Sequence, residues 1–390
     1  MSQIANIGFA LTLTSIRLEM GILEKIKAIE EEMARTQKNK ATEYHIGRLK
    51  ARLAKLRSEL LTPSGSKGES SGFDVSSFGD GRIALIGFPS VGKSSLLSAL
   101  TGTKSEVAAY EFTTLTCIAS VIHYNDAKLQ LLDLPGIIEG ASKGRGRGRQ
   151  VIAVARSSDL ILMVLDATKD DSQKRKLESE LEACGIRLNK QPPNVKITRK
   201  KIGGIKFTSQ VALTKMDAKL VQSILNEYRI FNADVVFRED ISVDEFIDVL
   251  EGNRKYMRCL YVYNKIDLLS LHEIKELASK HSCVPISVNA DLNLDGLLER
   301  IWTAMSIVRV YTKKKGSFPD FSDPLILTHQ RGPVTVETAV CRLHRDIMNE
   351  FSRAIVWGRS VRFSPQNVGR EHLLEDEDVM QIVKKQATKK

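Results

Sequence analysis

The residues Gly87-Phe88-Pro89-Ser90-Val91-Gly92-Lys93-Ser94 match the pattern G-x-x-x-x-G-K-[ST]. The apolar run at 82–86 before them predicts a short buried strand, and the run SLLSAL at 95–100 predicts the start of a helix. In this setting the glycines let backbone N–H groups surround a phosphate, and the helix N-terminus favours its negative charge. The stretch therefore predicts a phosphate-binding loop rather than an ordinary glycine-rich turn.

Individual residues of this loop have distinct expected roles. Lys93 is expected to reach the β- and γ-phosphates, and Ser94 to hold Mg²⁺. The predicted phosphate-binding residues are Gly87, Phe88, Pro89, Ser90, Val91, Gly92, Lys93, Ser94 and Ser95.

The segment Asn264-Lys265-Ile266-Asp267 follows an apolar run at 260–263 and indicates which base is bound. In guanine-specific proteins with this loop, the carboxylate of N-K-x-D accepts hydrogen bonds from N1–H and the 2-amino group, which adenine does not offer. Asn264 is expected at the opposite edge of the ring and the Lys265 stem on its face. Ser287 and Val288 are candidates for a last guanine-contacting loop. The sequence therefore predicts a guanine nucleotide.

Between these motifs, Asp133-Leu134-Pro135-Gly136 forms a D-x-x-G at the end of an apolar run. Asp133 is expected to reach Mg²⁺ through water, and the Gly136 N–H to meet the γ-phosphate; a Pro-Gly turn is the alternative. Upstream, residues 110–115 are expected to form the loop of a first switch, and there we choose Thr114 over Thr113 as the residue that completes the Mg²⁺ shell. The predicted catalytic residues are Lys93, Thr114 and Gly136, and the predicted metal-binding residues are Ser94, Thr114 and Asp133.

The residue after the D-x-x-G is Ile137, where small signalling GTPases place a glutamine that orients the attacking water. An isoleucine neither donates nor accepts a hydrogen bond. The sequence therefore predicts slow intrinsic hydrolysis, assisted by a further loop, a cation or a partner.

Three segments carry a resemblance to a known family. The segment DLPGIIEGA at 133–141, GRGRGRQVIAVAR at 144–156 and FTTLT at 112–116 resemble the Obg superfamily, and within it the developmentally regulated GTP-binding proteins. The stretch starting GILEKIKAIEEEMART at Gly21 is most similar to the second eukaryotic subgroup. The similarity covers about residues 20 to 388.

This resemblance implies several properties. It implies an inserted domain similar to part of ribosomal protein S5, a C-terminal β-grasp TGS domain, a role with the translation machinery, and an RWD-domain regulatory protein as partner. Relatives with an apolar residue at the position of Ile137 can use K⁺ as an activator, although the asparagine that usually supports K⁺ is Ser90 here.

The composition of the chain limits which binding partners and which cellular compartment we expect. The net charge is +11 over 390 residues, which favours polyanions such as RNA or ribosomes, with a solvated basic surface as the alternative. The five cysteines are scattered without a C-x-x-C pair, which argues against a zinc site or a disulfide framework. No apolar run approaches the length of a membrane span. We expect a cytoplasmic protein, monomeric or heterodimeric.

The predicted fold class is α/β: a P-loop GTPase with a parallel central sheet covered on both faces. Strands are expected near 82–86, 129–133, 160–166, 260–264 and 284–287. We expect a disordered leader at 1–19, a helical hairpin at 20–62, a linker at 63–79, the GTPase domain at 80–172 and 251–310, an inserted S5-like α/β domain at 173–250, and a TGS domain with a basic tail at 311–390. A targeting segment is the alternative for the leader.

Within the flanking domains the pattern predicts further elements. The insert is expected to hold a helix at 170–188, a hairpin at 196–207 around Gly203-Gly204, and a helix at 218–231. The TGS segment is expected to hold strands at 324–328, 354–357 and 378–383 and a helix at 336–349 capped by Thr335. In the hairpin, Arg48, Lys50, Arg52, Lys55 and Arg57 form either an RNA-facing surface or the charged flank of a coiled coil.

The leading functional hypothesis is a GTP-hydrolysing switch that acts with ribosomes and is regulated by the RWD-domain protein. The alternatives are a nucleotide-stabilised RNA- or ribosome-binding scaffold with negligible turnover, and an ATP-using enzyme, against which Asn264 and Asp267 argue. The repeat with Arg145, Arg147 and Arg149 has three readings: an internal arginine finger, an RNA-contacting switch, or a flexible basic loop.

Overall fold

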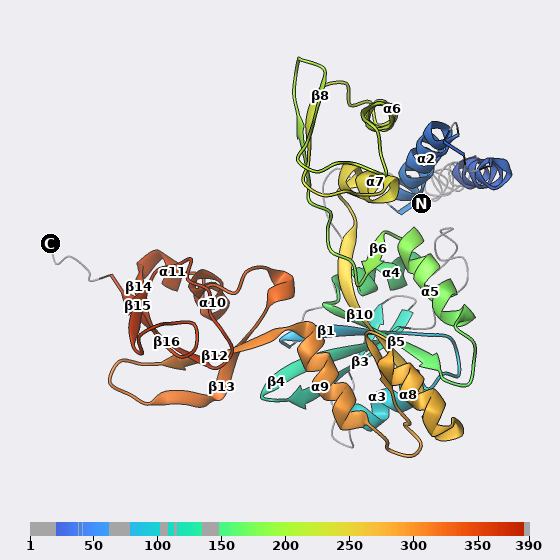
Figure 1. Ribbon diagram of the computed structural model, residues 1–390. Coiled ribbons are helices and arrows are strands. Elements are labelled where there is room, and N and C mark those ends of the chain that lie inside the picture. Colours follow the sequence, from blue (N-terminus) through green and yellow to red (C-terminus); the bar gives the residue numbers. More distant parts are fainter. Residues whose placement is uncertain are drawn as a thin grey trace, which may run out of the picture. The chain divides into compact units, whose positions relative to one another are not determined.

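The computed structural model describes residues 21–37, 39–40, 42–61, 79–101, 108–112, 115–134 and 148–385 (Figure 1). The chain forms two compact units. The first comprises Met1–Gly72, Ile138–Ile152 and Glu178–Tyr256, and the second comprises Phe73–Ile137, Ala153–Leu177 and Met257–Lys390. No helix in the described ranges is long and apolar enough to cross a membrane.

A central sheet dominates the second unit. Its strands follow the order β11-β10-β5-β1-β4-β3-β2. They are β1 (Gly81–Ile86), β2 (Ala108–Phe112), β3 (Leu115–Tyr124), β4 (Ala127–Asp133), β5 (Leu160–Asp166), β10 (Lys255–Asn264) and β11 (Cys283–Pro285). Neighbours from β11 to β4 are parallel, whereas β3 is antiparallel to both β4 and β2. The predicted P-loop α/β class is confirmed, but the sheet is mixed rather than wholly parallel.

The antiparallel edge corrects the expectation that 110–115 is a loop. Residues 110–112 belong to β2 and Leu115 begins β3. The turn between β3 and β4 is Asn125-Asp126, with φ of 47° and 63°. Two residues at positive φ form the tight turn that favours a hairpin. This turn brings β3 back along β4, and β2 then adds to the free edge of β3.

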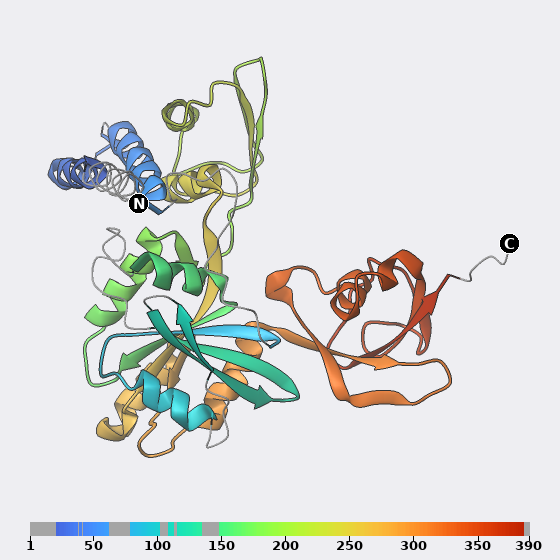
Figure 2. The same cartoon turned by 180° about the vertical axis from the view of Figure 1, so that it is seen from behind.

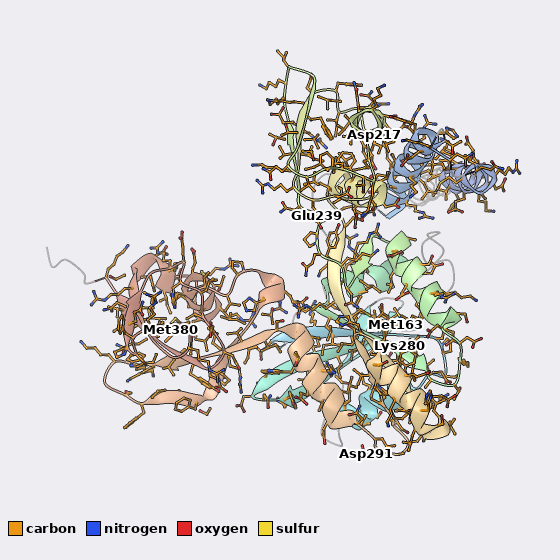
Figure 3. All side chains as sticks on the ribbon, viewed as in Figure 1. Met163, Asp217, Glu239, Lys280, Asp291 and Met380 are labelled. Carbon is orange, nitrogen blue, oxygen red and sulfur yellow. The ribbon has the colours of Figure 1, made fainter. Side chains whose placement is uncertain are left out.

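Helices cover both faces of the sheet (Figures 1 and 2). On one side lie α3 (Lys93–Thr101), α8 (Leu271–Ser279) and α9 (Leu294–Met305). Leu96 and Ile301 pack there in one core with Ile83 and Val262. On the other side lie the final residues of α4 (Gly148–Ser157) and the first residues of α5 (Ser172–Ala183). Met163 of β5, labelled in Figure 3, is fully buried at the centre of the sheet.

In the first unit, a three-stranded sheet has the order β7-β9-β8. The strands are β7 (Val195–Arg199), β8 (Ile205–Ser209) and β9 (Ala233–Phe237). The expected hairpin at 196–207 is therefore wrong: β9 pairs antiparallel to β7 and parallel to β8, so it separates the two strands. Pairing β9 with both strands places Val235 and Phe237 in the core of this unit.

Two helices expected in and before this unit are shorter than predicted. The one expected at 170–188 ends at Ala183, and β6 (Ile186–Leu188) follows, because Gly185 adopts φ +82° and stops the helix. The one expected at 218–231 is α6 (Ala218–Glu227), and Arg229 just beyond it adopts φ +57°.

The N-terminal segment of this unit is helical at 21–35 and in α2 (Glu43–Leu61). Helix α2 buries small residues against α6 and α7 (Val243–Glu251). Ala51 and Ala54 belong to the same core as Leu220, and a Cβ at Gly47 would lie 2.8 Å from Leu220 Cδ1. Small residues therefore supply part of the packing surface of α2.

The basic residues of α2 face acidic partners in the same unit. Arg48 and Arg52 pair with Glu227, Lys50 pairs with Asp244, and Arg57 pairs with Glu30. These pairs offset much of the charge that the RNA-facing reading required. Of the two readings left open for this helix, the structure favours the charged flank.

The C-terminal part of the second unit is a five-stranded sheet with the order β13-β12-β16-β14-β15. Its strands are β12 (Ile307–Lys313), β13 (Pro319–Thr328), β14 (Phe351–Trp357), β15 (Gln366–Val368) and β16 (Asp378–Lys384). Val310, Val356 and Met380 form its core with Val336 and Val340 of α10 (Val336–Leu343). Thr335 caps α10 through a capping box. The expected helix at 336–349 is interrupted, because His344 is extended and a separate short helix, α11 (Ile347–Glu350), follows.

Candidate functional site

The sequence motifs gather at one edge of the central sheet. The loop at 87–92 joins β1 to α3, Asp133 ends β4, Asn264 ends β10, and Ser287 follows β11. All four positions lie at the carboxyl ends of parallel strands, where open α/β sheets bind their ligands.

The loop at 87–92 has a backbone that requires glycine at two positions. A Cβ at Gly87 would lie 2.5 Å from the Val164 carbonyl oxygen, and one at Gly92 would lie 2.4 Å from Asn264 Nδ2. Gly92 also adopts φ +93°, which strains any other residue. The loop therefore packs against β5 and β10 as closely as its backbone allows.

The side chain of Lys93 folds back onto the backbone of this loop. Its Nζ donates to the carbonyl oxygens of Gly87 and Phe88, each at 2.9 Å. Burial lowers the pKa of Lys93, although the charge of Asp133 opposes the shift. A desolvated ammonium surrounded by backbone groups is well placed to attract a polyphosphate.

Ser94 and Asp133 lie side by side beyond the lysine. The Ser94 hydroxyl donates to Asp133 Oδ2 at 3.1 Å, while Asp133 Oδ1 is buried and has no hydrogen-bond partner among the described residues. Burial raises the pKa of Asp133 by more than the Ser94 hydrogen bond and the Lys93 charge lower it. A hydroxyl beside a carboxylate with an unsatisfied oxygen suits Mg²⁺, which prefers oxygen ligands and retains water.

Asn264 connects three loops of the site. Its side chain is 4 % exposed, and Nδ2 donates to the Val91 carbonyl at 2.9 Å. Oδ1 accepts from the backbone N–H groups of Lys265 at 2.8 Å and Val288 at 3.2 Å. The sequence interpretation gave Asn264 only a base contact, whereas here it ties the phosphate loop to the guanine motifs.

Asp267 and Ser287 come together from two different loops. Ser287 is fully buried, and its hydroxyl donates to Asp267 Oδ1 at 2.6 Å and accepts from the Ala290 N–H. Asp267 itself is exposed in the short helix η3 (Ile266–Leu268). The serine thus orients a solvent-facing carboxylate, which is the arrangement that reading a base requires.

Asp166 is a site residue that the sequence interpretation missed. Its Oδ2 lies 2.7 Å from Lys265 Nζ, and its Oδ1 accepts from Thr168 Oγ1 at 2.7 Å. Burial raises its pKa, but the hydrogen bonds from Lys265 and Thr168 outweigh this and lower the pKa overall. The available signal was an acidic residue ending the apolar run LILMVLD, the same strand-end position that identified Asp133.

Several predicted site residues lie outside the described part of the chain. These are Thr113, Thr114, Gly136, Ile137, Arg145 and Arg147. Arg149 lies within α4. The catalytic roles of Thr114 and Gly136 therefore stay predictions.

Comparison with known families and proteins identifies the chain. Residues 82–200 match the family described as 50S ribosome-binding GTPase, 202–307 match the C-terminal region of that domain, and 308–384 match the TGS domain. Developmentally-regulated GTP-binding protein 2 of Mus musculus and that of Homo sapiens are each 61% identical over 369 residues, covering 94% of this chain and 100% of the relative. Developmentally-regulated G-protein 2 of Arabidopsis thaliana is 60% identical over 367 residues, covering 94% of this chain and 92% of its own. The chain belongs to the developmentally regulated GTP-binding protein family.

Membership of this family confirms the resemblance found in the sequence. This developmentally regulated GTP-binding protein is a GTP-binding switch of a GTP-hydrolysing family, with a P-loop GTPase domain and a C-terminal TGS domain. Mg²⁺-assisted nucleotide binding is the general property of this fold.

Solved structures resemble it only weakly. Era of Aquifex aeolicus bound to GDP.AlF4- is 23% identical, covering 58% of this chain and 57% of that chain, with a TM-score of 0.31. A GTP-binding protein of Sulfolobus solfataricus in complex with GDP is 17% identical, covering 73% and 66%, also with a TM-score of 0.31. TM-scores this low add nothing to the family assignment.

Proposed function

We propose that this protein is a Mg²⁺-dependent switch that hydrolyses GTP slowly and acts with the translation machinery. The observation that supports guanine specificity is a pair of linked contacts: Ser287 holds Asp267, and Asn264 ties the backbone beside Ser287 to the loop that precedes Lys93. Asn264 does so by bonding to Val91 on one side and Val288 on the other. Base reading and phosphate binding then belong to one rigid site.

Within this site each residue has a defined task. Lys93 balances the charge of the β- and γ-phosphates, and Asp267 accepts from the guanine N1–H and 2-amino groups. Ser94 and Asp133 would hold Mg²⁺, which neutralises charge on the phosphates when bound. Thr114 and Gly136 complete the γ-phosphate side, so that their loops change order when GTP becomes GDP.

Slow hydrolysis follows from Ile137, which supplies no group to orient water. A loop, a partner or K⁺ beside the phosphates would provide the missing assistance, and turnover in KCl compared with NaCl tests the cation. A scaffold with negligible turnover is the competing function. Single-turnover GTP hydrolysis measured with and without ribosomes separates the two.

The cellular setting is part of the same proposal. A net charge of +11, the TGS domain and the match to a ribosome-binding GTPase family support contact with ribosomes or RNA. We also propose an RWD-domain regulatory protein as partner, a monomeric or heterodimeric state, an inserted domain similar to part of ribosomal protein S5, and a cytoplasmic location.

The decisive experiment replaces Asp267, the residue proposed to recognise the guanine base. Asp267→Asn should weaken GDP binding by at least about 100-fold and create affinity for xanthosine diphosphate, because the amide now faces a carbonyl where the 2-amino group stood. Isothermal calorimetry of the full chain measures both nucleotides. Asp323→Asn, which removes an exposed carboxylate in β13, is the matched control and should bind GDP as the parent does. Undiminished guanine preference in Asp267→Asn, or no heat from GDP with the parent protein, would refute the proposal.

A further inference from the structure

The first unit contains a cavity of about 460 Å³, and no residue of the nucleotide motifs lines it. This volume lies in the range of about 300–1,000 Å³ that is usual for small-molecule sites. The wall comes from the helix at 21–35, from α2, α5 and α7, and from Arg187 and Arg254; we call it the Arg254 cavity. The apolar residues of the wall are Met33, Leu53, Ala54, Ala183 and Ile247.

Two buried arginines in this wall share one buried carboxylate. The side chain of Asp248 is 3 % exposed, that of Arg187 15 % and that of Arg254 6 %. Arg187 donates to both oxygens of Asp248, from Nε at 2.6 Å and from Nη2 at 2.7 Å, and its Nη1 donates to the Glu182 carbonyl at 2.7 Å. Every nitrogen of the Arg187 guanidinium therefore has a partner.

Arg254 is satisfied at only one of its three guanidinium nitrogens. Its Nε donates to Asp248 Oδ1 at 3.0 Å, whereas no residue in the described part of the chain accepts from its Nη1 or Nη2. These two nitrogens carry four of the five N–H donors of an arginine. Because buried donors without acceptors are costly, a ligand that brings two acceptor oxygens to this place would gain binding energy.

A glycine keeps the space beside these nitrogens open. Gly185 adopts φ +82°, and a Cβ at this position would lie 2.8 Å from Arg254 Nη1. Any other residue would be strained in its backbone and would press against the guanidinium. The residue that ends α5 thus also leaves room at the unsatisfied edge of Arg254.

The charge around this edge is +1. The other charged side chains of the wall have partners of opposite sign. These pairs are Arg57 with Glu30, Lys50 with Asp244, and Glu182 with Lys190. Only the group formed by Arg187, Arg254 and Asp248 has a cation in excess, because two guanidinium groups face one carboxylate.

This excess of one charge selects the class of ligand. A carboxylate carries a single negative charge, and its two oxygens match the two terminal nitrogens of an arginine. A polyphosphate or a nucleic acid would bring several negative charges toward a wall that already holds four carboxylates. A ligand without any charge would leave the excess uncompensated. The apolar residues of the wall offer a surface for a hydrocarbon body.

We propose that the Arg254 cavity binds a small organic monocarboxylate with an apolar body. The carboxylate accepts from Nη1 and Nη2 of Arg254, and the body packs against Leu53 and Ile247. The site is separate from the nucleotide motifs and does not depend on the function proposed for them.

The test uses the full-length chain with excess GDP and 4-phenylbutyrate as the probe. Saturation-transfer NMR should show saturable binding with a dissociation constant of about 1 mM, the strength expected for a ligand of this size. The neutral amide of the same acid and inorganic phosphate should each bind at least about 10-fold more weakly. Arg254→Gln should weaken the binding of 4-phenylbutyrate by about 10-fold or more, because a hydrogen-bonded charge is lost.

Arg199→Gln makes the same substitution at an exposed position of β7 and should leave the affinity for the probe unchanged. Ala183→Leu fills the cavity without removing a charge and should also weaken binding, so it decides the matter if Arg254→Gln does not fold. GDP affinity measured by calorimetry should be equal in all variants, which keeps this result independent of the nucleotide site. Equal affinity of the parent and both cavity variants for 4-phenylbutyrate would overturn the proposal, as would equal binding of the acid and its amide, or no saturable binding to the parent.

Discussion

At the scale of one residue, Asp133 is a carboxylate whose unfavourable environment favours the binding of a cation. The carboxylate is partly buried beside Ser94, and one of its oxygens has no hydrogen-bond partner in the part of the chain that the structure describes. Burial raises its pKa for this reason. An anion that is poorly solvated in the nucleotide-free protein gains most when a cation arrives.

Replacing this carboxylate should therefore stabilise the nucleotide-free protein while destroying its function. At pH 7 we expect Asp133→Asn to raise the stability of the nucleotide-free chain by about 1 kcal/mol and to lose Mg²⁺-dependent GTP binding. The pKa of Asp133 is raised in the folded protein, so the folded state holds this proton more tightly than the unfolded state does. The stability gained in this way is fully present below the ordinary aspartate pKa. It is lost as pH rises through the folded-state pKa of Asp133. The advantage of Asp133→Asn should accordingly grow from acid to neutral pH.

Thermal unfolding of both proteins across this pH range measures the difference. Asp126→Asn, in the exposed turn between β3 and β4, makes the same charge change and should show no such trend. Identical melting temperatures for Asp133→Asn and the parent at every pH would contradict the argument.

At the scale of elements, α2 shows how small residues determine where a helix packs. Gly47, Ala51 and Ala54 recur at intervals of four and three residues and allow α2 to lie close against α6 and α7. Charged pairs, such as Lys50 with Asp244, lie along its sides. Close approach comes first, because a larger residue at any of these positions would push the helices apart.

Ala51→Leu should destabilise the first unit by about 1–3 kcal/mol, because Ala51 is fully buried and extra methyl groups find no room. Urea unfolding followed by circular dichroism measures the change. Glu43→Leu introduces the same side chain at an exposed position of the same helix and should change stability by less than about 0.5 kcal/mol. Equal effects of the two substitutions would show that α2 is not closely packed.

At the scale of the whole molecule, the second unit joins the nucleotide sheet to the TGS domain through a buried carboxylate. Asp159 is 8 % exposed and accepts from Arg331 Nη2 at 2.7 Å and Nε at 3.2 Å. The same carboxylate accepts from the backbone N–H of Arg82, at the start of the strand that leads to the phosphate loop. Strand β1 and the short helix η4 (His329–Arg331) therefore share one anchor.

Arg331→Ala should destabilise the full chain by about 1–3 kcal/mol, because it leaves a buried carboxylate with fewer donors. Adding Asp159→Asn to this variant should recover part of the loss, since an amide is cheaper to bury without its partner. Differential scanning calorimetry measures each variant. Arg342→Ala is the control, because its pair with Asp80 is longer, at 3.5 Å, and more exposed, and it should cost less than about 0.5 kcal/mol. If the double variant recovers none of the lost stability, the argument that Asp159 anchors the two segments is wrong.

Much of the central sheet and of the site could be predicted because the signals are local. The strands at 82–86 and 160–166 are short apolar runs, and the loop at 87–94 acts through consecutive backbone groups whose geometry its own glycines permit. Asp166 escaped prediction because a single acidic residue after a strand gains meaning only beside Lys265, a residue 99 positions away in sequence.

The sequence by itself determined the nucleotide motifs, the strands that carry them and the family. Only the tertiary structure decided that β9 separates β7 from β8, that α2 packs by its small residues, and that Asn264 joins three loops. The reason is physical. Motifs and apolar runs act through neighbours in the chain, whereas strand order, close packing and shared hydrogen bonds depend on which distant segments meet when the hydrophobic core closes.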